Sequence, residues 1–290
     1  MNKIYVYRFF FIAFSTIFVH FTTFAQSSGI PKVTVFVHGS DTTPKTFITM
    51  IERYLHHAPG MYSLQTINPS YRYARYINNL CSYNSEIFPQ EHMYLFCWSG
   101  KLSNSERSNA ANDLHEALEI LISFYKEKYE TIDLTIITHS HGGNVVLNLA
   151  HIKEKPNYSI RTLILMATPV QEKTKYLVDH TCFKETKMYA LYSTLDIHQI
   201  IDPQGLNIKI KSYLNFFNKQ TITKKELETP FFSERMFSSD HIKHIKIKTK
   251  MGILSHIEFI LPSFAKKMTS LLESAQKHDF SSEEILIFTY

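Results

Sequence analysis

Residues 134–143 constrain the fold of this chain more than any other stretch of its sequence. Residues 134–138 form a short apolar, β-branched run, which predicts a buried strand. Ser140 follows almost at once, and Gly142 and Gly143 precede a second apolar run at 144–150 that predicts a buried helix. Glycines suit this position, because a Cβ there would collide with the sheet. The stretch therefore predicts a strand, one sharp turn at Ser140, and a helix.

The same alternation of strand and helix extends over most of the chain. Strands are expected at residues 33–37, 93–98, 134–138, 162–166, 188–192 and 241–248. Helices are expected at residues 44–57, 104–125, 141–150 and 257–274. Several of the strands are apolar on both faces, which is typical of a parallel sheet that is buried on two sides. We therefore expect the α/β class, with a mostly parallel central sheet and helices on both faces.

Three of these helices carry their own start signals. Pro44 stands at the beginning of the first one, where its fixed φ and missing N–H are tolerated. Ser103 and Glu106 have the spacing of a capping box. Pro262 lies near the first turn of the last helix. These signals support the expected order of elements.

Two stretches do not fit the alternation. Residues 58–91 are rich in tyrosine, and residues 203–240 form an aromatic-rich insertion before the last expected strand. Long connections in such folds serve as functional lids or form mobile surface. The sequence shows no internal repeat and no low-complexity tract, so we expect a single domain over residues 26–290.

The first 25 residues have the pattern of an export signal. Lys3 and Arg8 form a basic start, an apolar run follows at 9–19, and Ala25 offers a small residue at a cleavage point. The run is shorter than the roughly 20 residues that span a membrane. We expect residues 1–25 to be a signal peptide, with an uncleaved N-terminal anchor as the alternative. In both cases the protein is exported, as a secreted, periplasmic or membrane-anchored chain.

Charge and cysteine content exclude several classes of protein. Lys3 and Arg8 belong to the export segment, so the remainder has 29 basic and 26 acidic residues, a balance of +3. This is close to neutral for a nucleic-acid binder, and we expect no nucleic-acid partner. Three cysteines allow at most one disulfide bridge. The sequence contains no C-x-x-C or H-E-x-x-H motif, so neither a metal site nor a cofactor is expected.

A serine on a strand-to-helix turn implies a catalytic base and an acid elsewhere in the chain. The hydroxyl of Ser140 is a poor nucleophile until a base takes its proton, and the base needs a carboxylate to fix its tautomer. The acid is expected after a later strand and the histidine after a strand later still. Asp196 follows the strand at 188–192 by a short loop and is the favoured acid. Asp202 is the alternative, but it lies beside Pro203, which suits a turn or helix cap.

His256 is the expected base. It follows the strand at 241–248 and precedes the last helix, which is where a general base belongs in this order. His139 and His141 flank Ser140 too closely to accept its proton, so we interpret them as walls of the site. Acyl transfer also requires two hydrogen-bond donors for the oxyanion. We expect these to be the backbone N–H of His141, directly after the serine, and that of Ser40, after the first strand.

Taken together, these segments resemble the α/β-hydrolase superfamily, and within it the lipase-like and esterase-like serine hydrolases. The resemblance extends from about residue 31 to residue 272, with Thr168-Pro169 similar to the turn found in lipase-like members. The segment 96–100, which contains Trp98, is also similar to bacterial members, but no chemistry is assigned to it. One departure is Thr138, which stands where the G-x-S-x-G motif has its first glycine.

The resemblance implies an α/β-hydrolase fold and a carboxylic ester hydrolase that acts through an acyl-enzyme. Ser140 would attack, His256 would transfer the proton, and Asp196 would hold the imidazole. The aromatic insertion favours lipid or other acyl esters as substrates, with peripheral membrane contact as a further possibility. Two alternatives stay open. One is an amidase or peptidase with the same triad, and the other is an inactive hydrolase fold that serves as a binding protein.

Overall fold

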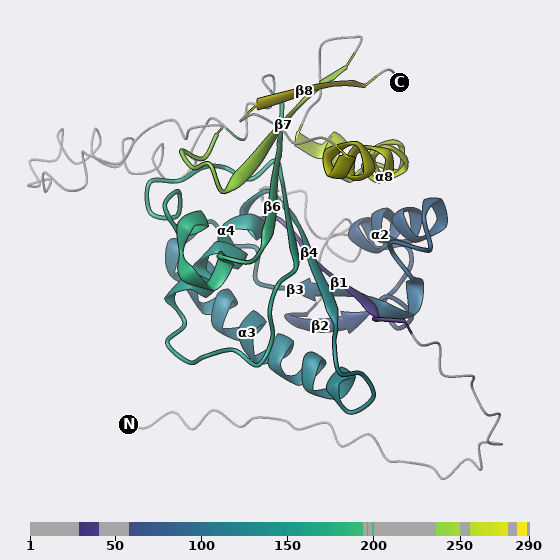
Figure 1. Ribbon diagram of the computed structural model, residues 1–290, viewed down its shortest axis with the longest axis vertical. Coiled ribbons are helices and arrows are strands. Elements are labelled where there is room, and N and C mark those ends of the chain that lie inside the picture. The colour runs from purple at the N-terminus through teal and green to yellow at the C-terminus, as the bar shows by residue number, and fades with distance from the viewer. Residues whose placement is uncertain are drawn as a thin grey trace, which may run out of the picture.

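The computed structural model describes residues 29–40, 58–193, 196, 199, 236–249, 256–277 and 283–288. Its described strands form one sheet in the order β2-β3-β1-β4-β5-β6-β7-β8 (Figure 1). All neighbouring pairs are parallel except β2 and β3, which are antiparallel at one edge. The strands are β1 (Lys32–Val37), β2 (Gly60–Ser63), β3 (Met93–Cys97), β4 (Asp133–His139), β5 (Thr162–Met166), β6 (Lys187–Tyr192), β7 (Ile242–Thr249) and β8 (Glu283–Phe288).

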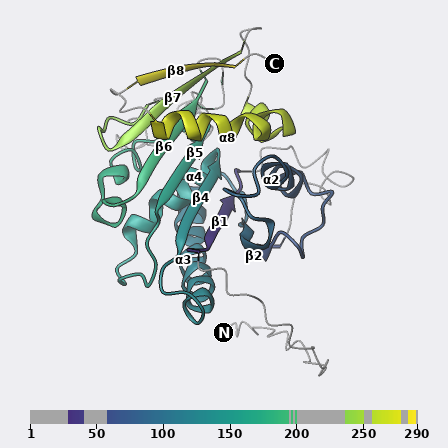
Figure 2. The ribbon, with the colours of Figure 1, turned by 45° about the vertical axis from the view of Figure 1, so that its right-hand side comes forward.

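Helices cover both faces of this sheet. The described α-helices are α2 (Arg72–Tyr83), α3 (Asn104–Lys126), α4 (His141–Leu147) and α8 (Pro262–Lys277). Short 3₁₀ segments are η2 (Gln90–His92), η3 (Asn148–His151), η4 (Leu177–Asp179), η5 (Thr181–Phe183) and η6 (His256–Ile260). Figures 1 and 2 show α2 and α8 side by side on one face, with α3 and α4 on the other.

The sheet is buried on two sides because its central strands carry apolar side chains on both faces. In β5, Leu163 and Leu165 belong to the core under α3 and α4, whereas Ile164 and Met166 belong to the core under α2 and α8. None of these four side chains is exposed. Burying each of them contributes about 1.5–3 kcal/mol relative to an exposed position. The expected α/β class, with a mostly parallel sheet and helices on both faces, is confirmed.

Three elements were not expected from the sequence. The tyrosine-rich stretch at 58–91 contains β2 and α2, and β8 follows α8 at the far edge of the sheet. The last strand is therefore β8, and the aromatic-rich insertion lies before β7 rather than before the last strand. Residues 203–235 of that insertion lie outside the described residues, as do the expected helix at 44–57 and the expected export segment.

Two start signals were wrong in detail. Ser103 is the N-cap of α3, but its side chain makes no capping hydrogen bond. The carboxylate of Glu106 instead accepts from Ser99 Oγ at 2.8 Å, so the capping box does not form. At the other end of the chain, residues 256–260 form η6, and the α-helix begins at Pro262 rather than at Ile257. Proline suits this start because it has no N–H to leave unsatisfied.

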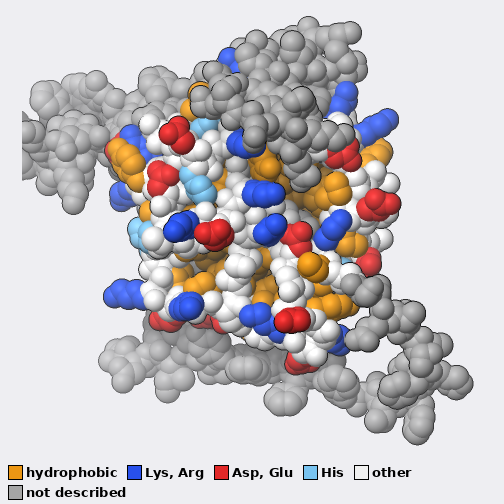
Figure 3. Space-filling model, in the orientation of Figure 1, with side chains coloured by type: hydrophobic (Ala, Val, Ile, Leu, Met, Phe, Trp, Pro, Cys, Tyr) orange, Lys and Arg blue, Asp and Glu red, His pale blue; other side chains and the backbone are white. Residues whose placement is uncertain are grey.

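The described surface carries charges of both signs. Figure 3 shows Lys and Arg side chains interspersed with Asp and Glu over the face seen in Figure 1. None of the helices described is both long and apolar enough to cross a membrane.

Candidate active site

Ser140 occupies the sharp turn between β4 and α4. Its backbone has φ 53° and ψ −133°, a conformation that non-glycine residues rarely adopt. The backbone N–H of Ser140 donates to Met166 O at 2.8 Å, and Ser140 O accepts from the N–H of Gly143 at 3.0 Å. These bonds hold the strained turn between β5 and the start of α4. Strain of this kind persists only where the surrounding structure enforces it, and it is concentrated at functional sites.

The two glycines of the turn are required by close contacts. A Cβ on Gly142 would lie 2.4 Å from Val37 O and 2.6 Å from His38 O, both of them backbone atoms. A Cβ on Gly143 would lie 2.2 Å from Thr168 Oγ1. The start of α4 is thus pressed against β1 on one side and against the turn after β5 on the other.

Thr138, which departs from the usual motif, lies within the sheet and makes a hydrogen bond of its own. Its side chain is fully buried, and Oγ1 donates to the carbonyl of Ile164 on β5 at 3.3 Å. The hydroxyl is therefore satisfied by the neighbouring strand. A threonine is accommodated on the strand side of the turn without an unpaired polar group.

Asp196 and His256 are brought together at the carboxyl edge of the sheet. Asp196 follows β6, is fully buried, and its Oδ2 lies 2.7 Å from Nδ1 of His256. The side chain of His256 is 12% exposed. Because a carboxylate can only accept, Nδ1 of His256 is the donor, and in the neutral ring Nε2 is left with the lone pair. This is the tautomer that a general base at Ser140 requires.

Gln199, which the sequence did not single out, fixes the loop that carries Asp196. Its backbone N–H donates to Asp196 Oδ1 at 3.3 Å, and its side-chain Nε2 donates to Thr168 O at 3.3 Å. Its Oε1 accepts from the N–H of Ser193, also at 3.3 Å. The loop is thereby tied to both β6 and the turn after β5. Asp202, the alternative acid, lies outside the described residues.

His139 links the serine turn to the loop of His256. Its Nε2 donates to the backbone carbonyl of His256 at 3.0 Å, and the two rings lie 4.8 Å apart between centroids. Burial, with a further contribution from the neighbouring His256, holds the pKa of His139 well below its usual range. Among the described residues, no hydrogen bond joins Ser140 Oγ to the His256 ring. His139, the residue before Ser140, thus connects the serine turn to His256 by a hydrogen bond.

His141, the residue after the serine, is also buried. Its pKa is lowered well below the usual range, first by burial and then by the nearby charges of Arg107 and His256. Both histidines beside Ser140 are therefore neutral at neutral pH. Their interpretation as walls of the site agrees with their burial.

The loop after β1 packs directly onto the serine turn. A Cβ on Gly39 would lie 2.7 Å from Ser140 Cβ and 3.1 Å from both Nδ1 and O of His139. Only glycine allows this approach. The loop continues at Ser40, whose Oγ is buried without a hydrogen-bond partner. The loop that carries Ser40 thus contacts the serine turn through Gly39, and His141 directly follows Ser140. Their role as oxyanion donors stays a prediction.

The structure combines a mostly parallel sheet with a positive-φ serine between β4 and α4. Asp196 follows β6 and His256 follows β7. The chain has the α/β-hydrolase fold. No family model matches the sequence, and no curated protein matches it either.

Three solved structures are similar to this chain at low sequence identity. One is an alpha-beta serine hydrolase homologue from Coxiella burnetii, at 12% identity and TM-score 0.39 over 83% of this chain and 87% of that one. An esterase from Pyrococcus furiosus has 12% identity and TM-score 0.41, over 85% and 81%. A fluorophosphonate-binding serine hydrolase from Staphylococcus aureus has 11% identity and TM-score 0.37, over 88% and 87%. Likeness at this level assigns no substrate and no catalytic residue to this chain.

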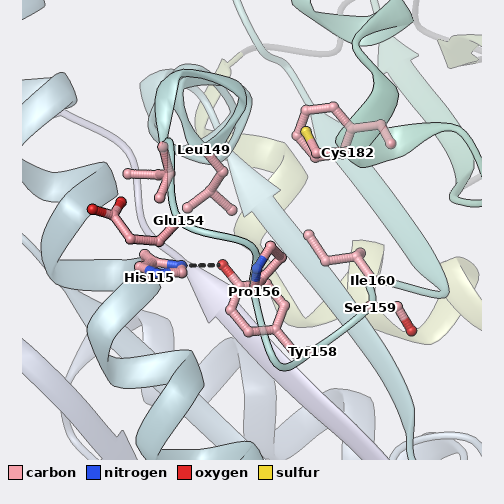
Figure 4. Close-up of a pocket in the computed structure, with 10 residues that line it drawn as sticks. His115, Leu149, Glu154, Pro156, Tyr158, Ser159, Ile160 and Cys182 are labelled. Carbon is pink, nitrogen blue, oxygen red and sulfur yellow. Dashed lines mark hydrogen bonds between the residues drawn. The ribbon is translucent and has the colours of Figure 1, made fainter.

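A cavity of about 90 Å³ lies elsewhere in the fold (Figure 4). Its wall includes Leu149 and Ile152, at the far end of the α4–η3 segment from Ser140. His115 and Tyr158 also line it and are joined by a hydrogen bond of 3.0 Å between Nδ1 and the hydroxyl oxygen. Cys182 reaches the same cavity, and burial raises the pKa of its thiol to about 11. The cavity is therefore separate from the serine site.

Proposed function

We propose that this protein is a serine hydrolase that cleaves carboxylic esters through an acyl-enzyme. The observation that carries the proposal is the 2.7 Å contact between Asp196 Oδ2 and His256 Nδ1, next to a serine on a strained strand-to-helix turn. None of these groups alone would indicate acyl transfer. Their meeting at one edge of the sheet, from three separate segments of the chain, supports acyl transfer.

In the proposed reaction, Ser140 Oγ attacks the ester carbonyl while His256 Nε2 takes the hydroxyl proton. Asp196 stays ionised and stabilises the imidazolium that forms. The proton then passes to the leaving alcohol, and the ester bond breaks to give the acyl-serine. Water attacks this acyl-enzyme in the second half-reaction, with His256 again acting as base, and the free acid leaves.

The oxyanion of each tetrahedral intermediate would accept hydrogen bonds from the backbone N–H groups of Ser40 and His141. Gly39 supports this assignment because it allows the Ser40 loop to contact the serine turn. Losing one such donor typically costs about 10²–10³ in rate. Backbone donors are fixed by the fold, so they need no reorganisation during the reaction.

An ester with an apolar acyl group is the substrate class that we propose. Ile257, which directly follows His256, is 51% exposed, and Leu261, just after η6, is 38% exposed. These side chains offer an apolar surface next to the proposed base, where an acyl chain can pack. Both lipid esters and small acyl esters fit this description.

Export of the chain remains our proposal from residues 1–25. It is tested by expressing the full chain in a bacterial host and sequencing the N-terminus of the protein recovered from the periplasm or medium. A mature chain that begins at Gln26 is the expected result. Recovery of the intact chain in the membrane fraction would favour the anchor instead.

A fluorophosphonate probe tests the proposed reaction at Ser140. The purified protein should be labelled covalently, and Ser140→Ala should abolish the labelling without changing the unfolding midpoint. Ser99→Ala, a change of the same kind at an exposed position, is the matched control and should label normally. Well-folded protein that takes no label would favour an inactive binding protein.

Matched substrates separate an esterase from an amidase. p-Nitrophenyl esters of two to twelve carbons should be cleaved, with kcat/KM rising as the acyl chain lengthens. The corresponding p-nitroanilides should react far more slowly. A preference for the anilides would overturn the esterase assignment while leaving the triad in place.

A further inference from the structure

The side chains of His38 and Trp98 are stacked against each other beside the serine turn. Their rings lie 5.9 Å apart between centroids, with planes 20° from parallel. His38 follows β1 and Trp98 follows β3, so two neighbouring parallel strands deliver them to the same edge of the sheet. Each residue is only 3% exposed. The sequence drew attention to the segment around Trp98 but assigned no chemistry to it.

Hydrogen bonds fix the orientation and the tautomer of His38. The backbone N–H of Trp98 donates to His38 Nε2 at 3.0 Å. Since Nε2 accepts, the proton of the neutral ring sits on Nδ1. Nδ1 in turn donates to the carbonyl oxygen of Gly39 at 2.7 Å. Tyr73 of α2 also stacks on the imidazole, with ring centroids 5.4 Å apart.

The indole of Trp98 holds the preceding peptide in the same way. Its Nε1–H donates to the carbonyl oxygen of His38 at 2.7 Å. Two successive carbonyls of the loop after β1, those of His38 and Gly39, are therefore each held by a donor from this stacked pair. Apolar side chains of similar size could fill the same space, but they could not orient these two peptides.

Holding the Gly39 carbonyl also holds the N–H of Ser40. The two groups belong to one planar trans peptide unit, in which C=O and N–H point in opposite directions. We propose that His38 and Trp98 are positioning residues that fix the Ser40 N–H in the orientation needed to donate to the oxyanion. This inference rests on the proposed function and assigns a role to two side chains that do not themselves touch the reacting atoms.

Side-chain substitutions can remove these hydrogen bonds one at a time. Trp98→Phe keeps an aromatic ring but removes the indole N–H. His38→Asn keeps a donor near the position of Nδ1, whereas His38→Gln keeps an acceptor near the position of Nε2 and loses the donor to Gly39. Tyr125→Phe is the matched control, because it also removes a buried aromatic hydrogen-bonding group, but one on α3. The Tyr125 hydroxyl lies 2.7 Å from His92 Nδ1 and 3.1 Å from the hydroxyl of Tyr94.

The experiment measures kcat and KM for a p-nitrophenyl ester, with all rates expressed per Ser140 that a fluorophosphonate labels. It also measures Ki for an alkylboronic acid, whose tetrahedral adduct places an oxygen at the oxyanion position. We expect His38→Gln to lower kcat about 100-fold, the lower end of the loss of one oxyanion donor. Trp98→Phe should lower kcat less, about 10-fold, because His38 still holds the Gly39 carbonyl. KM should stay within about twofold, Ki should rise in parallel with the fall in kcat, and His38→Asn should recover about 10-fold over His38→Gln.

A purely structural role would give a different pattern. It would lower the unfolding midpoint and the labelled fraction, as we expect of Tyr125→Phe, but leave kcat and Ki per labelled serine unchanged. That result, or a rise in KM at constant kcat, would overturn the inference while leaving the proposed function intact. A wild-type chain whose Ser140 takes no label would overturn both together.

Discussion

Oδ2 of Asp196 accepts a hydrogen bond from Nδ1 of His256 at 2.7 Å, across two neighbouring parallel strands of the sheet. The carboxylate is fully buried, and a buried charge of this kind needs a partner. His256 supplies that partner and is held in one tautomer in return.

The first prediction follows from that tautomer. Asp196→Asn should preserve the shape of the site but allow the imidazole to carry its proton on the wrong nitrogen. We expect kcat to fall by about 10⁴, the typical loss for this change in a serine-histidine-aspartate triad. Asp202→Asn, the matched change at the alternative acid, should stay within about threefold by the same reasoning. Steady-state kinetics with a p-nitrophenyl ester decides, and equal mild losses would show that neither aspartate is the acid.

A second prediction concerns the glycines of the serine turn. Gly142→Ala would place its Cβ against the backbone carbonyls of Val37 and His38, which cannot rotate away. It should lower the free energy of unfolding by about 3 kcal/mol, at the upper end of the cost of overpacking. Gly29→Ala, where nothing lies within 4 Å, should have little effect. Urea unfolding followed by fluorescence gives both values.

Gly143→Ala should behave differently, because its Cβ would meet a side chain, that of Thr168. We expect a loss of about 1–3 kcal/mol that is partly restored by adding Thr168→Ala. The same second change should not restore Gly142→Ala. Rescue of both variants, or of neither, would contradict the contacts described for the start of α4.

A third prediction concerns the pH dependence of stability. His139 and His141 have pKa values well below the usual range in the folded protein, chiefly because they are buried. The unfolded chain therefore binds protons at these positions below about pH 6.5 that the folded chain does not. Their contribution to stability is present above that pH and is lost as pH falls.

His139→Gln and His141→Gln test this prediction in urea unfolding at pH 7.5 and pH 5.5. Each variant should lose about 1.4 kcal/mol less than the wild type over that interval, since one titrating group has been removed. The comparison does not depend on the intrinsic cost of each substitution, because only the change with pH is used. An identical change in the free energy of unfolding with pH for wild type and variants would contradict the conclusion that these histidines are buried and neutral in the folded protein.

A fourth prediction concerns Thr138. Thr138→Val keeps the shape of the side chain but removes the hydroxyl that donates to Ile164 O. The free energy of unfolding should fall by about 1 kcal/mol, the usual net value of one such hydrogen bond. Thr138→Gly restores the usual motif but should cost about 2 kcal/mol, since a buried side chain is lost and a strand is loosened. Both variants should keep kcat within about threefold, and a large fall in kcat would mean that Thr138 shapes the serine turn itself.

Six of the eight described strands could be predicted from the sequence, because each of those six carries its signal locally. Residues 162–166 were expected as a strand and form β5 with the same bounds, since an apolar β-branched run buried on both faces has few other solutions. The four-residue β2 offers too short a pattern. In α2 the signal is present, because Tyr73, Tyr76, Ile77 and Leu80 recur at helical spacing and are buried, but the density of tyrosines in this stretch favours an irregular connection over a helix.

The site shows the same division between local and distant signals. Ser140, Asp196 and His256 could be proposed because each follows a recognisable strand, and the order of parallel strands places their ends at one edge. The roles of Gln199 and Trp98 could not be proposed from the sequence, because they depend on hydrogen bonds to distant residues. Gln199 bonds to Asp196 and Thr168, and Trp98 bonds to His38. A sequence shows which groups can donate and accept, but the partners are chosen by strand pairing and loop geometry.

β6 and β7 are neighbours in the sheet, although 49 residues of chain separate Tyr192 from Ile242. The two strands that lead to Asp196 and His256 therefore lie about one strand spacing apart, roughly 4.8 Å between backbones, although a long stretch of chain connects them. The part of that connection beyond Gln199 can differ in length without moving the strands that lead to Asp196 and His256. The pairing of β6 with β7, rather than the chain between them, thus sets where Asp196 and His256 meet.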